Sequence, residues 1–548
     1  MEHEPYQSRF DPATGAPLVS DATLAQNTAQ NYDAAAVPPL QQPETKMRPL
    51  STKRDVWLAV LLALLGALLV DTLFYATAGL GMTICLCLLL LVTVWYLWKQ
   101  RRTVSGYALF CIAGAFALGL SMVFSDDGYL KFLAFVGCVG LMTLLPIELY
   151  QLRRRRPGTI YAIGDFCSML FVRTFGRLGG GCWSLFHKES GNGTPRKRKL
   201  GGVLAGIGLA VPAVAIVVPL LMFSDAAFEG LMDRFQPEDL VGHILTVLCG
   251  LFLALLLFSQ LFSVHSGERN DNQITPSGGK LDPVIAVSFL SALSLVYVLY
   301  LVSQAAYFFD GFRGLLPKGY TVAEYARRGF FEMSVVCVLN LGFVFLTLLL
   351  TRKQDGKAPL AVRLLALFVC VFSLVLVVTS ISKMFLYIHS FGLTRLRVLT
   401  SAFMLFLGVV FLAVILWLFV RKVPYVKVAV VAATVIVLAL SYANVDRIIA
   451  SYNVHAYLDG RLEAIDMDTL DELSDAAVPY LIELWDEHKY AAQARAQLRE
   501  RAYLLFDVKH VADRYELLPK KDDDFRSFNT VEYAAKQLIQ SHAAEIFK

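Results

Sequence analysis

Arginine side chains gather in two short polar segments of an otherwise apolar chain. The segments cover residues 310–330 and 388–397, with one lysine shortly before the second and one glutamate just after the first. Guanidinium groups that converge favour phosphate or carboxylate, because each presents a planar fork of N–H donors. The chemistry predicted here is therefore the binding of an anionic lipid or polymer. The candidate residues are Arg313, Arg327, Arg328, Glu332, Lys383, Arg395 and Arg397.

The alternative for these arginines is a purely structural role. Asp310, Glu324 and Glu332 lie in or beside the first segment and could neutralise most of its positive charge. Exposed ion pairs of this kind contribute little to stability and bind no ligand. The two alternatives differ in what occupies the guanidinium groups, and the sequence leaves both open.

A second group of candidates consists of polar residues inside apolar runs. Asp71 and Asn340 lie deepest in such runs, whereas Glu148, His243 and Lys383 lie nearer the ends. Polar groups are expensive in hydrocarbon, so each is either paired with a neighbouring helix or part of a polar path. Two prolines, Pro212 and Pro219, are expected to kink another apolar run, as in the broken helices of some transporters.

Motifs for catalysis and metal binding are missing from the sequence. There is no Walker motif, no H-E-x-x-H and no G-x-S-x-G. Cys85 and Cys87 would point to different faces of a helix, and the remaining cysteines are scattered through apolar runs. No catalytic residue, metal site, cofactor or nucleic-acid partner is predicted, and an enzyme is not favoured.

The elements that carry these residues are membrane spans. Apolar residues make up 56% of the 548-residue chain, charged residues only 17%, and the mean hydropathy is +0.55. A water-soluble chain of this length could not bury so much apolar surface in one core. About eleven runs reach the roughly 20 residues that a bilayer requires. We expect spans at 56–75, 78–98, 105–124, 130–149, 202–223, 241–264, 283–309, 331–350, 362–387, 398–420 and 425–442.

The distribution of lysine and arginine predicts the orientation. Basic residues lie in the predicted loops 99–104, 150–201, 265–282, 351–361 and 421–424, whereas the loops 125–129 and 224–240 are acidic. Basic loops stay in the cytoplasm. We therefore expect a multi-pass protein of a bacterial plasma membrane, with a cytoplasmic N-terminus and an extracytoplasmic C-terminal region.

The chain divides into three parts. Residues 1–52 are predicted to be a disordered tail, and residues 53–443 a transmembrane bundle with an interfacial segment at 158–187. Residues 444–548 are predicted to form a small soluble all-α domain, because Leu470, Leu473 and similar residues recur at helical spacing and no strand pattern is evident. The predicted fold class is all-α.

Four motifs resemble a family of bacterial polytopic membrane proteins known only as a domain of unknown function. They are Tyr320-Thr-Val-Ala-Glu-Tyr-Ala-Arg-Arg-Gly-Phe-Phe-Glu332, Gly392-Leu-Thr-Arg-Leu-Arg397, Asn444-Val-Asp-Arg-Ile-Ile-Ala-Ser-Tyr-Asn453 and Leu473-Ser-Asp-Ala-Ala-Val-Pro-Tyr-Leu481. The resemblance covers roughly residues 200–481. It implies a membrane protein and supplies no activity.

Three functions remain open from sequence. The first is a transporter, flippase or other lipid- or anion-handling protein with a basic site at the outer face. The second is a membrane-anchored sensor or scaffold that uses the C-terminal domain, and the third is an enzyme acting on a lipid-linked substrate. Membrane lipids are the expected partners in each case. A cavity that crosses the bilayer would favour transport.

Overall fold

The computed structural model describes residues 52–152, 160–179, 240–265, 279–312, 330–353 and 358–547 apart from short gaps, with a few short pieces between 187 and 225. Within these ranges, ten helices are long and apolar enough to cross a bilayer. They are α2 (Lys53–Tyr75), α3 (Leu80–Trp98), α4 (Gly106–Phe124), α5 (Gly128–Tyr150), α11 (Leu240–His265), α12 (Pro283–Phe312), α14 (Phe330–Leu350), α15 (Leu360–Phe391), α16 (Arg395–Phe419) and α17 (Tyr425–Ala443). The all-α membrane bundle predicted from the sequence is confirmed. The predicted span 202–223 and the N-terminal tail lie almost wholly outside the described residues.

Several helices begin at polar residues that stand directly before the apolar runs. The side chains of Ser105, Asp127 and Thr394 each accept a hydrogen bond from a backbone N–H of the first turn. Thr52 and Asp55 form a capping box at the start of α2. Such caps satisfy N–H groups that have no partner inside the helix.

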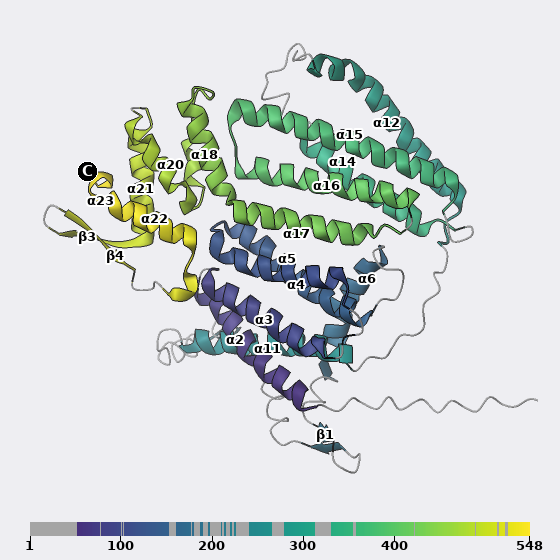
Figure 1. Ribbon diagram of the computed structural model, residues 1–548, viewed down its shortest axis with the longest axis horizontal. Coiled ribbons are helices and arrows are strands. Elements are labelled where there is room, and N and C mark those ends of the chain that lie inside the picture. The colour runs from purple at the N-terminus through teal and green to yellow at the C-terminus, as the bar shows by residue number, and fades with distance from the viewer. Residues whose placement is uncertain are drawn as a thin grey trace, which may run out of the picture. The chain divides into compact units, whose positions relative to one another are not determined.

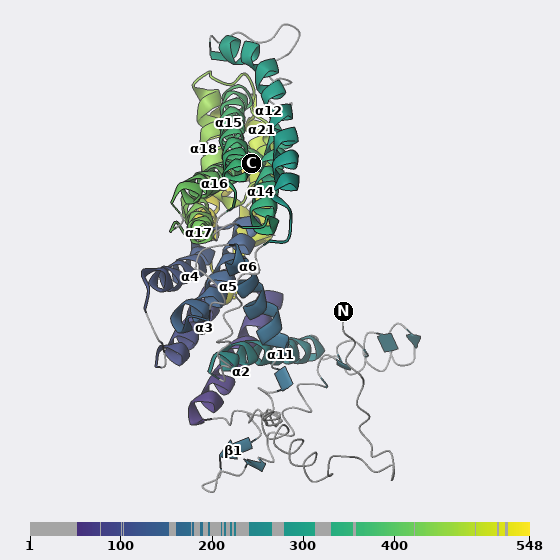
Figure 2. The same ribbon diagram turned by 90° about the vertical axis from the view of Figure 1, so that its right-hand side faces the viewer.

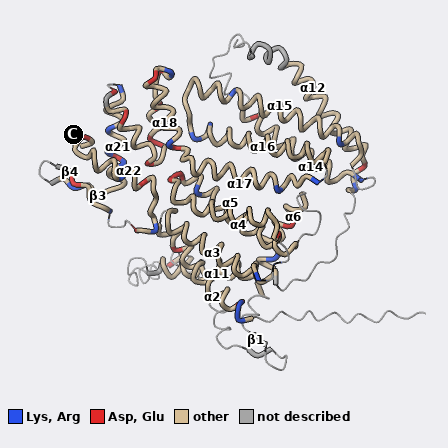
Figure 3. Tube along the Cα trace, in the orientation of Figure 1, with Lys and Arg blue, Asp and Glu red and all other residues tan. Residues whose placement is uncertain are grey.

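The helix ends define two faces. One face holds basic residues at the starts or ends of helices, and we call it the basic face (Figure 3); its described members include Lys53, Arg54, Arg101, Arg352, Lys353 and Lys422. The other, the domain face, holds Tyr75, Phe124, Gly128, Phe391 and Arg395. α5 ends at the basic face, whereas α11 begins at the domain face, where the His243 ring stacks on Tyr75. Which face is cytoplasmic stays a prediction.

The spans form two groups, each with its own apolar core. The first core joins α2, α3, α4, α5 and α11, and the second joins α12, α14, α15 and α16. α17 packs against α16 on one side and against α4 and α5 on the other (Figure 1). Within the described residues, α17 therefore connects the two groups.

Residues beyond α17 build a third apolar core. Its helices are α18 (Val445–Leu458), α19 (Met467–Asp471), α20 (Val478–Glu483), α21 (Ala491–Leu505), α22 (Thr530–Ser541) and α23 (Ala543–Ile546), with short 3-10 turns η2 (Asp475–Ala477), η3 (Leu484–Asp486) and η4 (Phe525–Ser527). We call residues 444–547 the C-terminal module. The expectation that it lacks strands is wrong, because β3 (Phe506–Val511) and β4 (Arg514–Pro519) form an antiparallel hairpin, with Phe506 opposite Pro519.

The region between α5 and α11 contributes a short helical stretch. α6 (Tyr161–Cys167), the π-helical η1 (Ser168–Arg173) and α7 (Thr174–Gly176) follow one another, and β1 (His187–Glu189) pairs with β2 (Pro195–Lys197). The Ser259 hydroxyl of α11 donates to the Thr174 carbonyl at 2.8 Å. α6 lies beside α5 in both views (Figure 2). That this stretch lies in the membrane interface stays a prediction.

Candidate functional site

An ion pair at the domain face joins the bundle to the C-terminal module. Arg395, the first residue of α16, donates from Nε and Nη2 to the two carboxylate oxygens of Asp446 in α18, at 3.1 and 2.7 Å. Asp446 is 0% exposed, and its Oδ2 also accepts the backbone N–H of Ser474 at 2.9 Å. A bidentate pair of this kind, in which the carboxylate is fully buried and the guanidinium is 33% exposed, has a fixed geometry. It sets the position of α18 on the end of α16.

A second contact beside this pair has no charge. The Asn453 amide accepts the N–H of Leu393 at 2.7 Å and donates to the Leu393 carbonyl at 2.8 Å. The preceding residue, Gly392, has φ +76°, and a Cβ there would lie 2.5 Å from Asn453 Oδ1. Glycine is therefore required for both the backbone conformation and the close approach.

A third contact ties the end of the chain to the first spans. Arg526 of η4 pairs with Asp71 of α2, and the same carboxylate lies 3.0 Å from His243 Nδ1 of α11. Nearby, Asn529 donates to the Ser125 carbonyl at 2.6 Å. The C-terminal module is thus attached to both helix groups.

The structure places two of the predicted arginines, Arg395 and Arg397, in structural contacts. Arg395 is held by Asp446, and Arg397 donates to the Phe391 and Gly392 carbonyls and lies 4.2 Å over the Tyr387 ring. The pairing alternative holds for Arg395, but its acids come from α18 and from the turn before α5 rather than from the 310–330 segment.

The other members of the predicted set have different outcomes. Lys383 of α15 interacts electrostatically with Glu332 of α14. Arg313, Arg327 and Arg328 lie outside the described residues. Convergence of the seven residues on one anion therefore stays a prediction.

The polar residues predicted inside the membrane are engaged by neighbours. Asn340 is 0% exposed. Its side chain accepts a hydrogen bond from the Tyr297 hydroxyl and donates one to Ser373 Oγ at 2.9 Å. The Ser373 hydroxyl in turn donates a hydrogen bond to the Val369 carbonyl at 2.8 Å. Asp71 is engaged by Arg526 and His243 as above. Both residues therefore link helices.

The bundle and the module enclose a polar cavity between them, which the sequence did not reveal. This junction pocket has a volume of about 530 Å³ and is lined by the turn before α5, the start of α16, the segment 471–475 and α21. Six carboxylates and two guanidinium groups line it: Asp126, Asp127, Asp471, Glu472, Asp475 and Glu500, with Arg395 and Arg501.

Asp127 is an acid of this pocket with a buried oxygen that accepts no hydrogen bond. Its Oδ1 caps α5 by accepting the Tyr129 N–H at 2.8 Å. Its Oδ2 is buried without a hydrogen bond, because the Arg395 N–H 3.3 Å away donates to Asp446 instead. Burial raises the pKa of Asp127, and repulsion from Asp446 adds to the effect while Arg395 opposes it. The pocket thus holds more negative charge than its arginines offset.

Asp475, on η2, is a second carboxyl group affected by the excess negative charge of the junction pocket. Burial raises its pKa to about 6, and the nearby carboxylate of Asp126 raises it further, while Arg501 opposes the shift. Arg501 lies 3.5 Å from Asp475 and also donates to four backbone carbonyls, including Leu473 at 3.0 Å. Arg501 therefore keeps several partners when Asp475 is protonated.

This shift predicts a pH-dependent stability. The pKa of Asp475 is higher in the folded than in the unfolded protein, so the stabilisation is full below pH 4 and is lost as pH rises through about 6. We expect Asp475→Asn to raise the melting temperature at pH 7.5 and to flatten its change between pH 4 and pH 7. Thermal unfolding of the purified protein across this range measures both. The exposed Glu463→Gln variant is the control, and an unchanged pH profile in Asp475→Asn would contradict the assignment.

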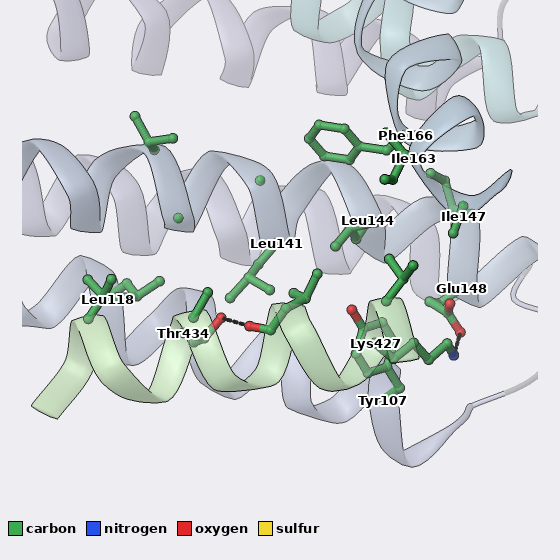
Figure 4. Close-up of a pocket in the computed structure, with 18 of the residues that line it drawn as sticks. Tyr107, Leu118, Leu141, Leu144, Ile147, Glu148, Ile163, Phe166, Lys427 and Thr434 are labelled. Atoms are coloured by element: carbon green, nitrogen blue, oxygen red, sulfur yellow. Dashed lines mark hydrogen bonds and ion pairs between the residues drawn. The ribbon is translucent and has the colours of Figure 1, made fainter. Parts of the chain in front are cut away.

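A second cavity lies within the bundle. This groove has a volume of about 370 Å³ and runs between α4, α5, α6 and α17. Apolar side chains line most of its length, and the ion pair Lys427 Nζ–Glu148 Oε2, 2.9 Å long, lies at the basic-face end (Figure 4). Glu148, considered from sequence as a residue near a span end, is therefore buried against a helix nearly 280 residues away in the chain.

Comparison with known families adds a classification. The family model described as "Domain of unknown function (DUF4153)" matches residues 112–484, more than half of the chain. The chain belongs to the DUF4153 family. No curated protein and no solved structure matches it. The part matched to DUF4153 contains Asp127, Arg395 and Asp446, together with the groove pair Glu148 and Lys427. α2, α3, α22 and the β3–β4 hairpin lie outside it.

Proposed function

We propose that this integral membrane protein is a receptor that binds an organic cation in the junction pocket at its domain face. The observation that carries the proposal is the buried Asp127 Oδ2, which accepts no hydrogen bond in a cavity with six carboxylates and two arginines. A buried carboxylate oxygen that accepts no hydrogen bond is unfavourable, even with the Arg395 guanidinium 3.3 Å away, so a ligand that supplies N–H groups stabilises it. Among the functions considered from sequence, this corresponds to the membrane-anchored sensor.

The shape and charge of the pocket favour an extended ligand with more than one amino group. Its volume of about 530 Å³ is in the range of small-molecule sites. Within the part of the chain that the structure describes, no three His, Cys, Asp or Glu residues are grouped closely enough to hold a metal ion. The acids are spread around the cavity instead. A polyamine can reach several of them at once.

The position of the pocket favours signalling over transport. Its walls belong to the bundle on one side and to the C-terminal module on the other. A ligand bound there contacts both and shifts the equilibrium between arrangements that differ in their affinity for it. The polar pocket lies at one face and the groove inside the bundle is apolar, so these two cavities do not form a polar path across the membrane.

Calorimetric titration of the full-length protein in nanodiscs with spermidine tests the proposal. We expect the double variant Asp471→Asn/Glu500→Gln to raise the Kd by at least about tenfold, because it removes two exposed carboxylates and about 1.4 kcal/mol of binding free energy. Neither side chain forms the buried Arg395–Asp446 pair, so the fold should persist.

The control is Glu463→Gln, which removes an exposed acid outside the pocket. Magnesium chloride at equal charge concentration measures non-specific attraction. If Mg²⁺ and spermidine bind equally, or if the double variant binds spermidine as the unmodified protein does, the junction pocket is not a receptor site.

A further inference from the structure

The groove beside α17 has the dimensions and the polarity of a lipid site. We infer that it holds one acyl chain of a phospholipid from the leaflet at the basic face, and that the headgroup of this lipid carries a phosphate and a primary amine, as in phosphatidylethanolamine. The inference is independent of the junction pocket, which lies at the opposite face. Four observations support it: the length of the groove, its open wall, the exposure of α17 and the charges at one end.

The groove extends over one leaflet. Lys427 and Val437, both on α17, line its two ends, and ten residues of α-helix span about 15 Å. This is half of the roughly 30 Å hydrocarbon core. Figure 4 shows Leu144, Leu141 and Leu118 following one another away from Lys427. An acyl chain that starts at headgroup depth therefore matches the groove along its whole length.

One wall of the groove is made by a glycine that has room beside it. A Cβ added to Gly140 of α5 would meet no atom within 4 Å, whereas one added to Gly137, a turn earlier, would lie 2.9 Å from Leu118 Cδ1. Gly137 is thus needed for the packing of α5 on α4. Gly140 instead leaves space that the protein does not fill.

α17 depends on surrounding lipid more than its neighbours do. Only 11% of its apolar window is buried inside the protein, against 50% for α4 and for α5. It nevertheless joins the two helix groups. Because dispersion contacts are lost wherever a cavity faces a helix, an ordered acyl chain in the groove would supply the packing that α17 lacks.

The charges at the basic-face end select the headgroup. Lys427 lies two residues inside the start of α17, at headgroup depth, and its ammonium group lies 4.2 Å over the Tyr107 ring. Glu148 and Asp165 line the same end of the groove. Among the described residues that line this end, one cation and two carboxylates can serve both parts of a zwitterion: the phosphate lies near Lys427, and the amine donates N–H bonds toward the acids.

Native mass spectrometry of the full-length protein provides the test. The protein, delipidated in mild detergent, is offered equal amounts of palmitoyl-oleoyl phosphatidylethanolamine, phosphatidylglycerol and phosphatidylcholine. We expect one phosphatidylethanolamine to be retained in preference to both others, because phosphatidylglycerol lacks the amine and the choline group has no N–H. This competition needs no variant. Equal retention of the three lipids, or a preference for phosphatidylglycerol, would overturn the headgroup assignment.

Gly140→Leu tests the groove itself. The leucine enters the open space without a clash at Cβ and is a better helix former than glycine, so the protein is expected to fold. Retention of phosphatidylethanolamine should fall at least about tenfold, or about 1.4 kcal/mol. Gly342→Leu on α14, where an added Cβ also meets nothing, is the matched control. If both variants melt like the unmodified protein and retain the lipid equally, the acyl chain does not lie in this groove.

Discussion

Replacing Asp446 by alanine is expected to lower the free energy of unfolding by about 3–5 kcal/mol. The change leaves the Arg395 guanidinium without the partner that accepts two of its hydrogen bonds, at 3.1 and 2.7 Å, and it removes the acceptor of the Ser474 N–H. Asp446 is fully buried, whereas the Arg395 side chain is 33% exposed beside the junction pocket, so the cost comes mainly from the emptied, buried site of the carboxylate. The partners that remain near Arg395 are the Glu472 carbonyl at 3.4 Å and Asp127, which would have to move to form a hydrogen bond.

Thermal and denaturant unfolding of the purified protein measure this effect. The control is Asp459→Ala, which removes an exposed ion pair with Arg461 and should change stability by less than about 1 kcal/mol. Breaking a buried pair and replacing both partners are different experiments. We therefore expect Arg395→Met/Asp446→Leu to be more stable than Asp446→Ala alone. If Asp446→Ala unfolds like Asp459→Ala, the pair does not hold the module on the bundle.

The bundle could be predicted because each span is specified locally. Twenty apolar residues between polar caps leave the chain no alternative to a helix in hydrocarbon. α14, predicted at 331–350, is found at Phe330–Leu350, and α11, predicted at 241–264, is found at Leu240–His265. Larger differences occur at helix ends in polar sequence, as at Phe391, where α15 continues four residues beyond its predicted end. There the apolar pattern gives no signal.

The residues that pair between different helices could not be predicted. The apolar periodicity of one helix does not indicate which other helices pack against it. Arg395 was identified as a candidate from its charge, but its partner Asp446 is 51 residues away and Asp127 lies before a different span. The acids considered from the sequence, Glu324 and Glu332, are not among the described partners of Arg395, and Glu324 lies outside the described residues. The junction pocket was missed for the same reason, since its walls come from four separate segments.

The hairpin in the C-terminal module was missed because its strands are short. Phe506, Val508 and Leu517 alternate with polar residues, but each strand has only six residues. The stretch directly before it, α21, has apolar residues at helical spacing, and this pattern predicts helix for the whole region. Six alternating residues beside a longer helical pattern are an ambiguous signal.

Gly250 carries the second large expected effect. α2 and α11 approach each other so closely that a Cβ on Gly250 would lie 2.5 Å from the Gly66 carbonyl oxygen, and a Cβ on Gly66 would lie 2.5 Å from that of Gly250. Both obstacles are backbone atoms, which cannot rotate away. Small residues permit such approaches between membrane helices. Gly250→Leu is therefore expected to separate the two helices.

We expect Gly250→Leu to destabilise the protein by about 3 kcal/mol or more, at the upper end of what overpacking produces, because the whole helix must shift. The His243–Asp71 contact lies two turns before Gly250 in α11 and should be lost as well. The ion pair between Arg526 and Asp71 would then be weakened. Gly342→Leu makes the same substitution where an added Cβ meets no atom within 4 Å, so it should leave the melting temperature unchanged or raise it slightly. Comparing the two variants separates the steric effect from the change in helix propensity, since only the steric effect differs between them. Equal melting temperatures for the two variants would show that α2 and α11 do not depend on backbone contact at Gly66 and Gly250.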